Sequence, residues 1–112
     1  MKKIICLFFI FSMSQAIAAN CGLVGGEDYL FCKGFTEKNC GIAGSGYLMC
    51  QAMTTNNCGI VGGRDYTFCK AYTEKNCGLA SGSDYYFCTA LVQKNCGIAS
   101  GRDYYMCKAL TE

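Results

Sequence analysis

Apolar residues recur at helical spacing in the stretch 84–95 of the chain. Phe87, Cys88 and Leu91 fall on one face of an α-helix, and Ala90 lies beside them. No proline interrupts the stretch, because the protein contains none. The pattern therefore predicts an amphipathic helix over residues 84–95.

The ends of this stretch carry residues typical of helix termini. Asp84 is expected as the N-cap, because its carboxylate can accept hydrogen bonds from the free amides of the first turn. Gly97 is expected to supply the left-handed residue that stops the helix. Corresponding residues recur along the chain: Asp28, Asp65 and Asp103 as caps, and Gly41, Gly59 and Gly78 as stops.

The predicted helix belongs to a unit that occurs five times. Aligned on Asn-Cys-Gly, the copies share the pattern N-C-G-[IL]-x-x-G-x-D-Y-x-[FM]-C, except that the second copy is one residue shorter and lacks the aspartate. Such self-similarity predicts a repeat architecture. The sequence thus indicates a single domain, residues 20–112, made of the units 20–38, 39–56, 57–75, 76–94 and 95–112.

A helix of this length is marginal alone in water, so neighbouring units must pack on it. We predict an all-α, disulfide-stapled tandem-repeat protein: five short helices, alternating in direction, joined by Gly-rich loops into an α-solenoid or compact bundle. The alternative is a small sheet or β-solenoid, because residues 85–89 (Tyr-Tyr-Phe-Cys-Thr) favour strands by propensity. Their apolar positions do not alternate for more than a few residues, which favours the helix.

The N-terminal segment has the three parts of a secretory signal peptide. A short positive segment precedes an apolar run at 4–11, and small residues follow it. The run is too short to span a membrane, which takes about 20 apolar residues. We expect residues 1–19 to be removed by cleavage after Ala18 or Ala19. The mature chain would then be periplasmic or secreted from a bacterial cell, without membrane insertion.

Ten of the eleven cysteines remain after this cleavage. So high a cysteine content in a short exported chain indicates a disulfide scaffold. Two local pairing schemes are possible. Pairing within a unit spans ten intervening residues, or nine in the second unit, whereas pairing between units spans seven.

Geometry and counting favour pairing within the unit. If Cys88 and Cys96 lie in and at the end of one helix, the helical rise separates them by about 12 Å. A disulfide requires Cα atoms within about 7 Å of each other. Pairing between units would also leave Cys21 and Cys107 without partners. The predicted disulfides are Cys21–Cys32, Cys40–Cys50, Cys58–Cys69, Cys77–Cys88 and Cys96–Cys107.

The spacing across unit boundaries resembles that of secreted bacterial cysteine-rich repeat proteins, which stack short helices joined by disulfides. The resemblance covers the C-x7-C spacing, and the unit here is half the length of theirs and lacks their alanine-rich helix pair. In that family the C-x7-C pair is bonded, so the resemblance implies the between-unit scheme, which stays open. The matching pairs are Cys32…Cys40, Cys50…Cys58, Cys69…Cys77 and Cys88…Cys96.

Charge and composition exclude several classes of function. Without the signal peptide, the acidic and basic residues balance, so no basic surface is expected to attract nucleic acid. Histidine is absent, so no general base of that type can activate a serine or cysteine. We expect no enzyme, no catalytic residue and no cofactor. Thiol-based metal binding is an alternative function, although no C-x2-C motif is present and no metal ligand is assigned. A small secreted toxin or effector is another.

Tyrosine recurs at one position in every unit. The structural interpretation is packing between units, with the hydroxyl groups in water. The functional interpretation is a face for an unidentified protein or glycan partner, because tyrosine offers a large contact area and a polar tip. We therefore expect a non-enzymatic protein-interaction module, of the inhibitor, immunity, envelope or adhesion type. The residues are Tyr29, Tyr47, Tyr66, Tyr85 and Tyr104.

Reduction of the disulfides should unfold the protein. In the chain-entropy model each loop of this size contributes on the order of 2–3 kcal/mol to stability. Circular dichroism should therefore show loss of the helical signal and of the melting transition after treatment with a reducing agent. An unchanged melting temperature would contradict the scaffold interpretation. Mass spectrometry of the untreated protein should show the loss of ten hydrogens and no bound metal.

Overall fold

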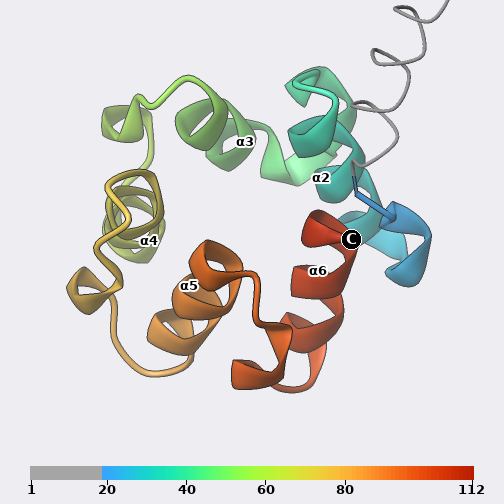
Figure 1. Cartoon of the computed structure of the whole chain (residues 1–112). Coiled ribbons are helices and arrows are strands. Elements are labelled where there is room, and N and C mark those ends of the chain that lie inside the picture. The colour runs from blue at the N-terminus through green and yellow to red at the C-terminus, as the bar shows by residue number, and fades with distance from the viewer. Residues whose placement is uncertain (1–18) are drawn as a thin grey trace, which may run out of the picture.

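The computed structural model describes residues 19–112, and they form an all-α protein (Figure 1). The all-α prediction is confirmed, and the strand alternative is wrong for this part of the chain. The predicted signal peptide lies, except for its last residue, outside the described residues. Each unit has a 3₁₀ turn, which begins at its first cysteine, and then an α-helix. The helices are α2 (Gly26–Thr36), α3 (Tyr47–Thr54), α4 (Gly63–Thr73), α5 (Ser83–Gln93) and α6 (Arg102–Thr111); the turns are η1 (Cys21–Leu23), η2 (Cys40–Gly46), η3 (Cys58–Ile60), η4 (Cys77–Leu79) and η5 (Cys96–Ile98).

The helices begin at glycine rather than at the predicted aspartate caps. Gly82 and Gly101 are the N-caps of α5 and α6, and both have a positive φ that a residue with a side chain rarely adopts. The chain thus enters the helix before it reaches the aspartate. Asp84 and Asp103 lie inside the first turn and make no capping hydrogen bond. The same correction applies to Asp28 and Asp65, whose helices have glycine N-caps.

The helices also end earlier than the predicted glycine stops. The left-handed residue is the last one of a unit, such as Lys38 with φ 54°. The amide of the following Asn39 then donates to the carbonyl of Gly34 at 2.8 Å, as in a Schellman motif. The glycines after the first cysteines do not have a positive φ, so Gly41, Gly59, Gly78 and Gly97 are not the stops. The other left-handed residues are Asn56, Lys75 and Lys94.

Each disulfide joins the 3₁₀ turn of a unit to the middle of the helix in the same unit. The Cα atoms of each pair are 5.6 to 5.7 Å apart, within the normal range. The structure therefore has the within-unit scheme, and the between-unit scheme that the resemblance implied is wrong. The bonds are Cys21–Cys32, Cys40–Cys50, Cys58–Cys69, Cys77–Cys88 and Cys96–Cys107.

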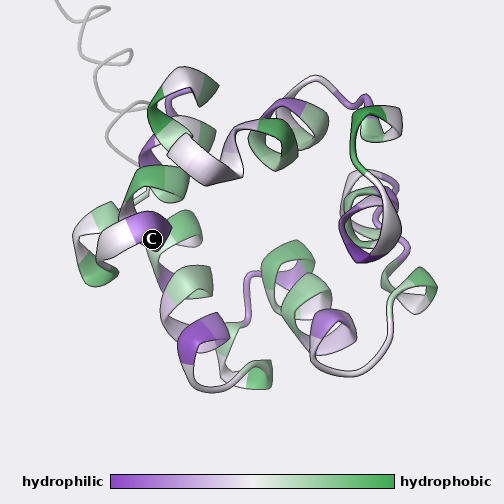
Figure 2. Cartoon of the chain, turned by 180° about the vertical axis from the view of Figure 1, so that it is seen from behind, coloured by the Kyte–Doolittle hydropathy of each residue, from purple (hydrophilic) through white to green (hydrophobic). Residues whose placement is uncertain are grey.

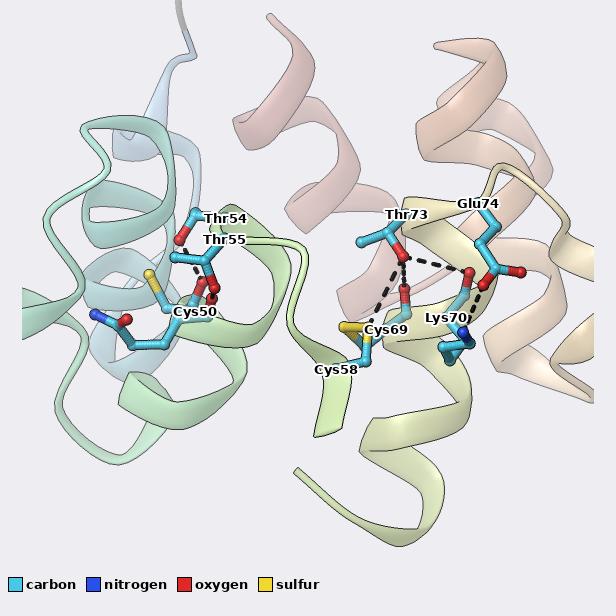
Figure 3. Close-up of a disulfide and its surroundings, with 9 residues drawn as sticks. Cys50, Thr54, Thr55, Cys58, Cys69, Lys70, Thr73 and Glu74 are labelled. Atoms are coloured by element: carbon cyan, nitrogen blue, oxygen red, sulfur yellow. Dashed lines mark hydrogen bonds and ion pairs between the residues drawn. A yellow bond between two sulfur atoms is a disulfide. The ribbon is translucent and has the colours of Figure 1, made fainter. Parts of the chain in front are cut away.

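A threonine lies over the disulfide in four of the five units. Figure 3 shows the arrangement in unit 3, where the Thr73 hydroxyl donates to the carbonyl of Cys69 at 2.8 Å. The same hydroxyl lies 3.8 Å from the sulfur of Cys58. Because the hydroxyl bonds back to its own helix, the threonine methyl and hydroxyl cover the sulfur without leaving a polar atom unsatisfied. Thr36, Thr54 and Thr111 repeat this geometry.

The chain runs once around a ring, so that the last helix, α6, packs against the first, α2 (Figure 1). At each unit boundary the asparagine amide donates to a carbonyl of the preceding helix, as described for Asn39. The same bond joins the amide of Asn20 to the carbonyl of Ala109, at 2.8 Å. Unit 1 therefore follows unit 5 in space as every other unit follows its predecessor. The compact bundle of the prediction is a closed ring.

The first turns of the helices lie at one end of the ring, which corrects the predicted alternation in direction. An ion pair between Arg64 and Asp84 joins the first turns of α4 and α5, and one between Arg102 and Asp28 joins those of α6 and α2. Ser45, just before α3, bonds to Glu27 in the first turn of α2. Alternation fails because the 3₁₀ turn and the Gly-rich loop together return the chain to the starting end of the ring.

Small residues let neighbouring units approach closely. The second residue after each helical cysteine is glycine or alanine, and all five are buried: Gly34, Ala52, Ala71, Ala90 and Ala109. The five helical cysteines are fully buried as well. Figure 2 shows hydrophobic and hydrophilic residues mixed along the helices of the ring. The main core therefore consists mostly of cysteine and alanine, together with Met53, Phe68 and Leu91.

The shortened second unit depends on two glycines. A Cβ atom at Gly46 would lie 2.9 Å from the Phe31 ring, and one at Gly34 would lie 3.2 Å from the Ala43 Cβ. Both distances are shorter than normal packing allows. Unit 2 has thus moved toward α2 to compensate for the missing residue, and glycine at both positions makes the approach possible.

The ring should tolerate circular permutation. Joining Glu112 to Asn20 through one added lysine reproduces the Thr-Glu-Lys-Asn sequence of residues 36–39 and 73–76. New ends placed between Asn56 and Asn57 fall at a unit boundary and break no disulfide. We expect the permutant to keep its helical circular dichroism, its five disulfides and a melting temperature within a few degrees.

A second permutant, opened between Phe68 and Cys69, supplies the control. It carries the same lysine junction, but its ends interrupt α4, so it should fold poorly. Equal stability of the two permutants, or unfolding of the first, would contradict the closed ring.

Candidate functional site

All five helices line one cavity of about 300 Å³ at the centre of the ring. Its wall is made by the residue before each helical cysteine, and a second layer lies one turn further along the helices. Four aspartates and two arginines of the first helical turns stand at its mouth. The wall residues are Phe31, Met49, Phe68, Phe87 and Met106; the second layer includes Met53, Leu91 and Leu110; the mouth residues are Asp28, Asp65, Asp84, Asp103, Arg64 and Arg102.

Aromatic rings form part of the wall and narrow the far end. Phe68 of α4 stacks on Phe87 of α5, with ring centroids 5.5 Å apart. Phe35 of α2 meets Tyr72 of α4 edge to face at 6.2 Å, in the layer of Leu91. Burial raises the pKa of Tyr72 above its ordinary value. The cavity is therefore a cup, with apolar walls, aromatic rings toward the C-terminal ends of the helices and a charged mouth at their N-terminal ends.

Two arginines at the mouth pair with aspartates of the following unit. Arg64 donates two hydrogen bonds to Asp84, at 2.7 and 2.8 Å. Arg102 of the last unit donates two to Asp28 of the first, at 2.7 and 2.6 Å. These bonds to Arg102 lower the pKa of Asp28. The second pair also links the two ends of the repeat array.

Two other aspartates at the mouth, Asp65 and Asp103, make no ion pair within residues 19–112. The pairing pattern gives the reason. Each arginine pairs with the aspartate of the next unit, but the unit before Asp103 has Ser83 at the arginine position and the unit before Asp65 is the shortened one. Burial, and then the nearby carboxylate of Asp84, raise the pKa of Asp103. With four carboxylates against two guanidinium groups, the mouth has a net charge of −2 at neutral pH.

A second hollow, of about 460 Å³, adjoins the cup beside α3. It shares Phe31, Met49 and Asp65 with the cup and extends past Ser45 and Gly46, where unit 2 lacks its aspartate. The Ser45 hydroxyl donates to Glu27 at 3.1 Å across this hollow's edge. The shortened unit therefore widens the mouth on one side.

The predicted tyrosine positions lie on the outside of the ring and do not form one cluster. Tyr29, Tyr47, Tyr66 and Tyr85 are exposed, whereas Tyr104 is half-buried. Tyr29, Tyr66 and Tyr104 each line a separate shallow hollow beside their own 3₁₀ turn. Because the helices surround a ring, one position on the outer face of each helix cannot form a single continuous face.

Aromatic pairs do occur on two neighbouring helices. On α5 the rings of Tyr85 and Tyr86 meet edge to face at 5.3 Å, and on α6 those of Tyr104 and Tyr105 do so at 5.2 Å. Tyr86 and Tyr105 are more than half exposed. The outer surface of α5 and α6 is therefore the aromatic part of the ring's circumference.

The sequence predicts Phe87 on the packed face of its helix and the four aspartates as helix caps, and it assigns no role in packing or capping to the other wall and mouth residues. The signal for a shared cavity was the recurrence of phenylalanine or methionine before each helical cysteine. Five such residues meet only if the helices begin at the same end and the chain closes into a ring. The alternating arrangement that we expected would not have brought them together.

The cysteines offer no thiol ligands in the oxidised protein, because all ten in residues 19–112 are in disulfides. The same residues contain no group of three histidine, cysteine or acidic side chains placed to hold a metal ion. Five disulfides indicate an oxidising environment, periplasmic or extracellular. Among the described helices, none has the length and apolar character needed to cross a membrane.

Replacing Asp103 should stabilise the protein at neutral pH. Its pKa is raised in the folded state, so its ionised form opposes folding above that pKa. We expect Asp103→Asn to raise the melting temperature by a few degrees at pH 7, since a solvent-screened charge interaction contributes about 0.2–1 kcal/mol and 1 kcal/mol shifts a domain of this size by about 4–8 °C. The gain should disappear as the pH falls below the ordinary aspartate pKa.

Asp28→Asn is the matched comparison, with the opposite sign. The pKa of Asp28 is lowered by Arg102, so its ionised form supports folding at pH 7 and this support is lost as the pH falls through the lowered value. The variant should melt a few degrees lower at pH 7. Thermal denaturation followed by circular dichroism between pH 2 and 7 measures both differences, and equal effects of the two variants would contradict these assignments.

Comparisons with protein-family models, with curated proteins and with solved structures found no match.

Proposed function

We propose that the protein is an exported, non-enzymatic binding protein of the bacterial periplasm or exterior, and that the central cup is its binding site. One observation carries the proposal: side chains from all five helices converge on a single apolar cavity of about 300 Å³. Small-molecule sites begin at about this volume, and they too are mostly apolar with a few polar groups.

A cavity of this size is unusual in a small protein, whose stability depends on close packing of its few apolar side chains. Protein interiors are normally packed to the density of organic crystals, with few voids larger than a water molecule. Larger side chains at Met49, Met53 and Met106 would fill the cup and add apolar burial. Instead the disulfides supply stability while the centre of the ring stays open. A scaffold held by disulfides also loses little freedom when it binds, which favours affinity.

Binding of an apolar probe tests the proposal. N-phenyl-1-naphthylamine is neutral and fluoresces strongly in apolar surroundings, so its emission should rise on addition of the oxidised protein. Met49→Trp, which places a larger ring in the cup, should weaken binding at least about tenfold, corresponding to about 1.4 kcal/mol. Fluorescence titration measures both affinities.

Thr67→Trp is the control, because residue 67 occupies the unit position at which Tyr86 and Tyr105 face outward. This variant should bind the probe as the original protein does. An absence of probe binding, or equal weakening by the two tryptophans, would contradict the assignment of the cup.

A second candidate is protein or glycan contact through the outer tyrosines. The exposed aromatic pairs of α5 and α6 favour it, since tyrosine is enriched in the centres of interfaces. In this case the protein would act as an interaction module of the inhibitor, immunity, envelope or adhesion type, and the cup would be incidental.

Alanine at Tyr86 and Tyr105 tests the second candidate. A partner captured from envelope extract by the oxidised protein should be lost with the double variant, because both side chains are exposed and make few contacts within the ring. Thr67→Ala alters the corresponding position of unit 3 and should leave capture unchanged. Capture that survives the double variant would rule out this surface.

A further inference from the structure

The pairing of the charged groups at the mouth of the cup leaves two carboxylates without an arginine partner. Arginine of one unit pairs with aspartate of the next, between units 3 and 4 and between units 5 and 1. One pair joins the first turns of α4 and α5 and the other joins those of α6 and α2, while Asp65 and Asp103 take no part in them. Both line the cup, from α4 and α6.

The position of Asp103 is unfavourable for its own charge. Burial and the carboxylate of Asp84 oppose its ionisation, and the two arginines, each engaged elsewhere, offset this only in part. Serine at residue 83, where units 3 and 5 have arginine, withholds the partner that Asp103 would otherwise have. The fold thus gains nothing from ionised Asp103, and a positively charged group at the mouth would supply the missing partner.

The side chains that line the cup below the carboxylates indicate what the uncharged part of the ligand should be. Phe31, Phe68 and Phe87 present aromatic surface, and Met49 and Met106 complete the same layer. Apolar surface of this kind favours a hydrocarbon or aromatic body, and phenylalanine faces also attract a cation that lies over them. A bare metal ion would not use these walls, and an anion would meet the net negative charge of the mouth.

We propose that the cup binds a small organic cation, with its apolar body between the phenylalanine and methionine side chains and its ammonium group at the carboxylates of the mouth, where Asp65 and Asp103 are not engaged by arginine. This inference rests on the proposed function, because it names the class of ligand for the same site. The adjoining hollow beside α3, where unit 2 lacks an aspartate, gives the ligand a side entrance.

Three probes of nearly equal shape separate charge from shape. They are 1-naphthylmethylammonium, the neutral 1-naphthylmethanol and the anionic 1-naphthoate, each titrated into the oxidised protein by calorimetry at pH 7 and low salt. The cation should bind about three- to tenfold more tightly than the alcohol, and the anion most weakly. Raising the salt concentration should weaken the binding of the cation alone, since partly exposed charges are screened.

Variants of the two free carboxylates complete the test. Asp65→Asn with Asp103→Asn should reduce the affinity for the cation to that for the alcohol and leave the alcohol unchanged. Glu74→Gln is the control, because Glu74 pairs with Lys70 away from the cup, and it should change neither affinity. Melting curves establish that each variant is folded.

The possible outcomes distinguish the two levels of the proposal. If alcohol and cation bind equally, or the anion binds best, the cation inference is overturned while the cup remains a binding site. If neither these probes nor N-phenyl-1-naphthylamine binds, the proposed function itself is overturned. If the double aspartate variant loses the preference for the cation and the Glu74→Gln control keeps it, both the proposed function and the cation inference are supported.

Discussion

The bond between the first cysteine of each unit and the cysteine in the middle of its helix is the constraint on which the rest of the structure depends. Helices of eight to eleven residues are marginal in water, because nucleation is costly and few hydrogen bonds follow it. The disulfide fixes the 3₁₀ turn against the helix within each unit, independently of the neighbouring units. Each unit thus has a defined shape where it meets the next unit. The buried glycine or alanine two residues after the helical cysteine lets the 3₁₀ turn of the next unit approach closely.

Closure of the ring follows from repeating that shape. The hydrogen bond from Asn20 to Ala109 and the ion pair between Arg102 and Asp28 reproduce, between the ends of the array, contacts made elsewhere between successive units. An open solenoid would leave one face of its first and last units without a neighbour. In the ring, every unit has two neighbours, so no capping repeat is needed.

Closure of the ring also creates the central cup. Stability would favour a filled centre, whereas the proposed function requires an open one. Five helices that begin at the same end of the ring bring one apolar position of each unit to a common centre, and they bring the first-turn aspartates to one end. A ring selected for stability alone would fill the centre and pair the charges. The protein leaves space at the centre and leaves Asp65 and Asp103 without arginine partners, which is consistent with a site for a cationic ligand.

The local features of the protein could be predicted from its sequence. Helical spacing around Cys88, the five-fold recurrence and the spacing of the cysteines are short-range properties, and the all-α class and the pairing within units follow from them. The positions of the caps could not be predicted as well, because aspartate and glycine both favour helix starts and the choice between them depends on the path of the loop. Asp84 bonds to a neighbouring unit rather than to its own helix.

The direction of the helices, the closure of the ring and the cup were decided by the tertiary structure. A repeat pattern indicates that the units are alike, but it does not determine the angle between neighbouring units. That angle decides whether five units form an open array or a ring. The relation of Asp103 to Asp84 and Arg102, and of Phe68 to Phe87, depends on contacts between units that no local pattern encodes. For the same reason the recurring tyrosines, identical in sequence position, point outward from a ring and do not share one face.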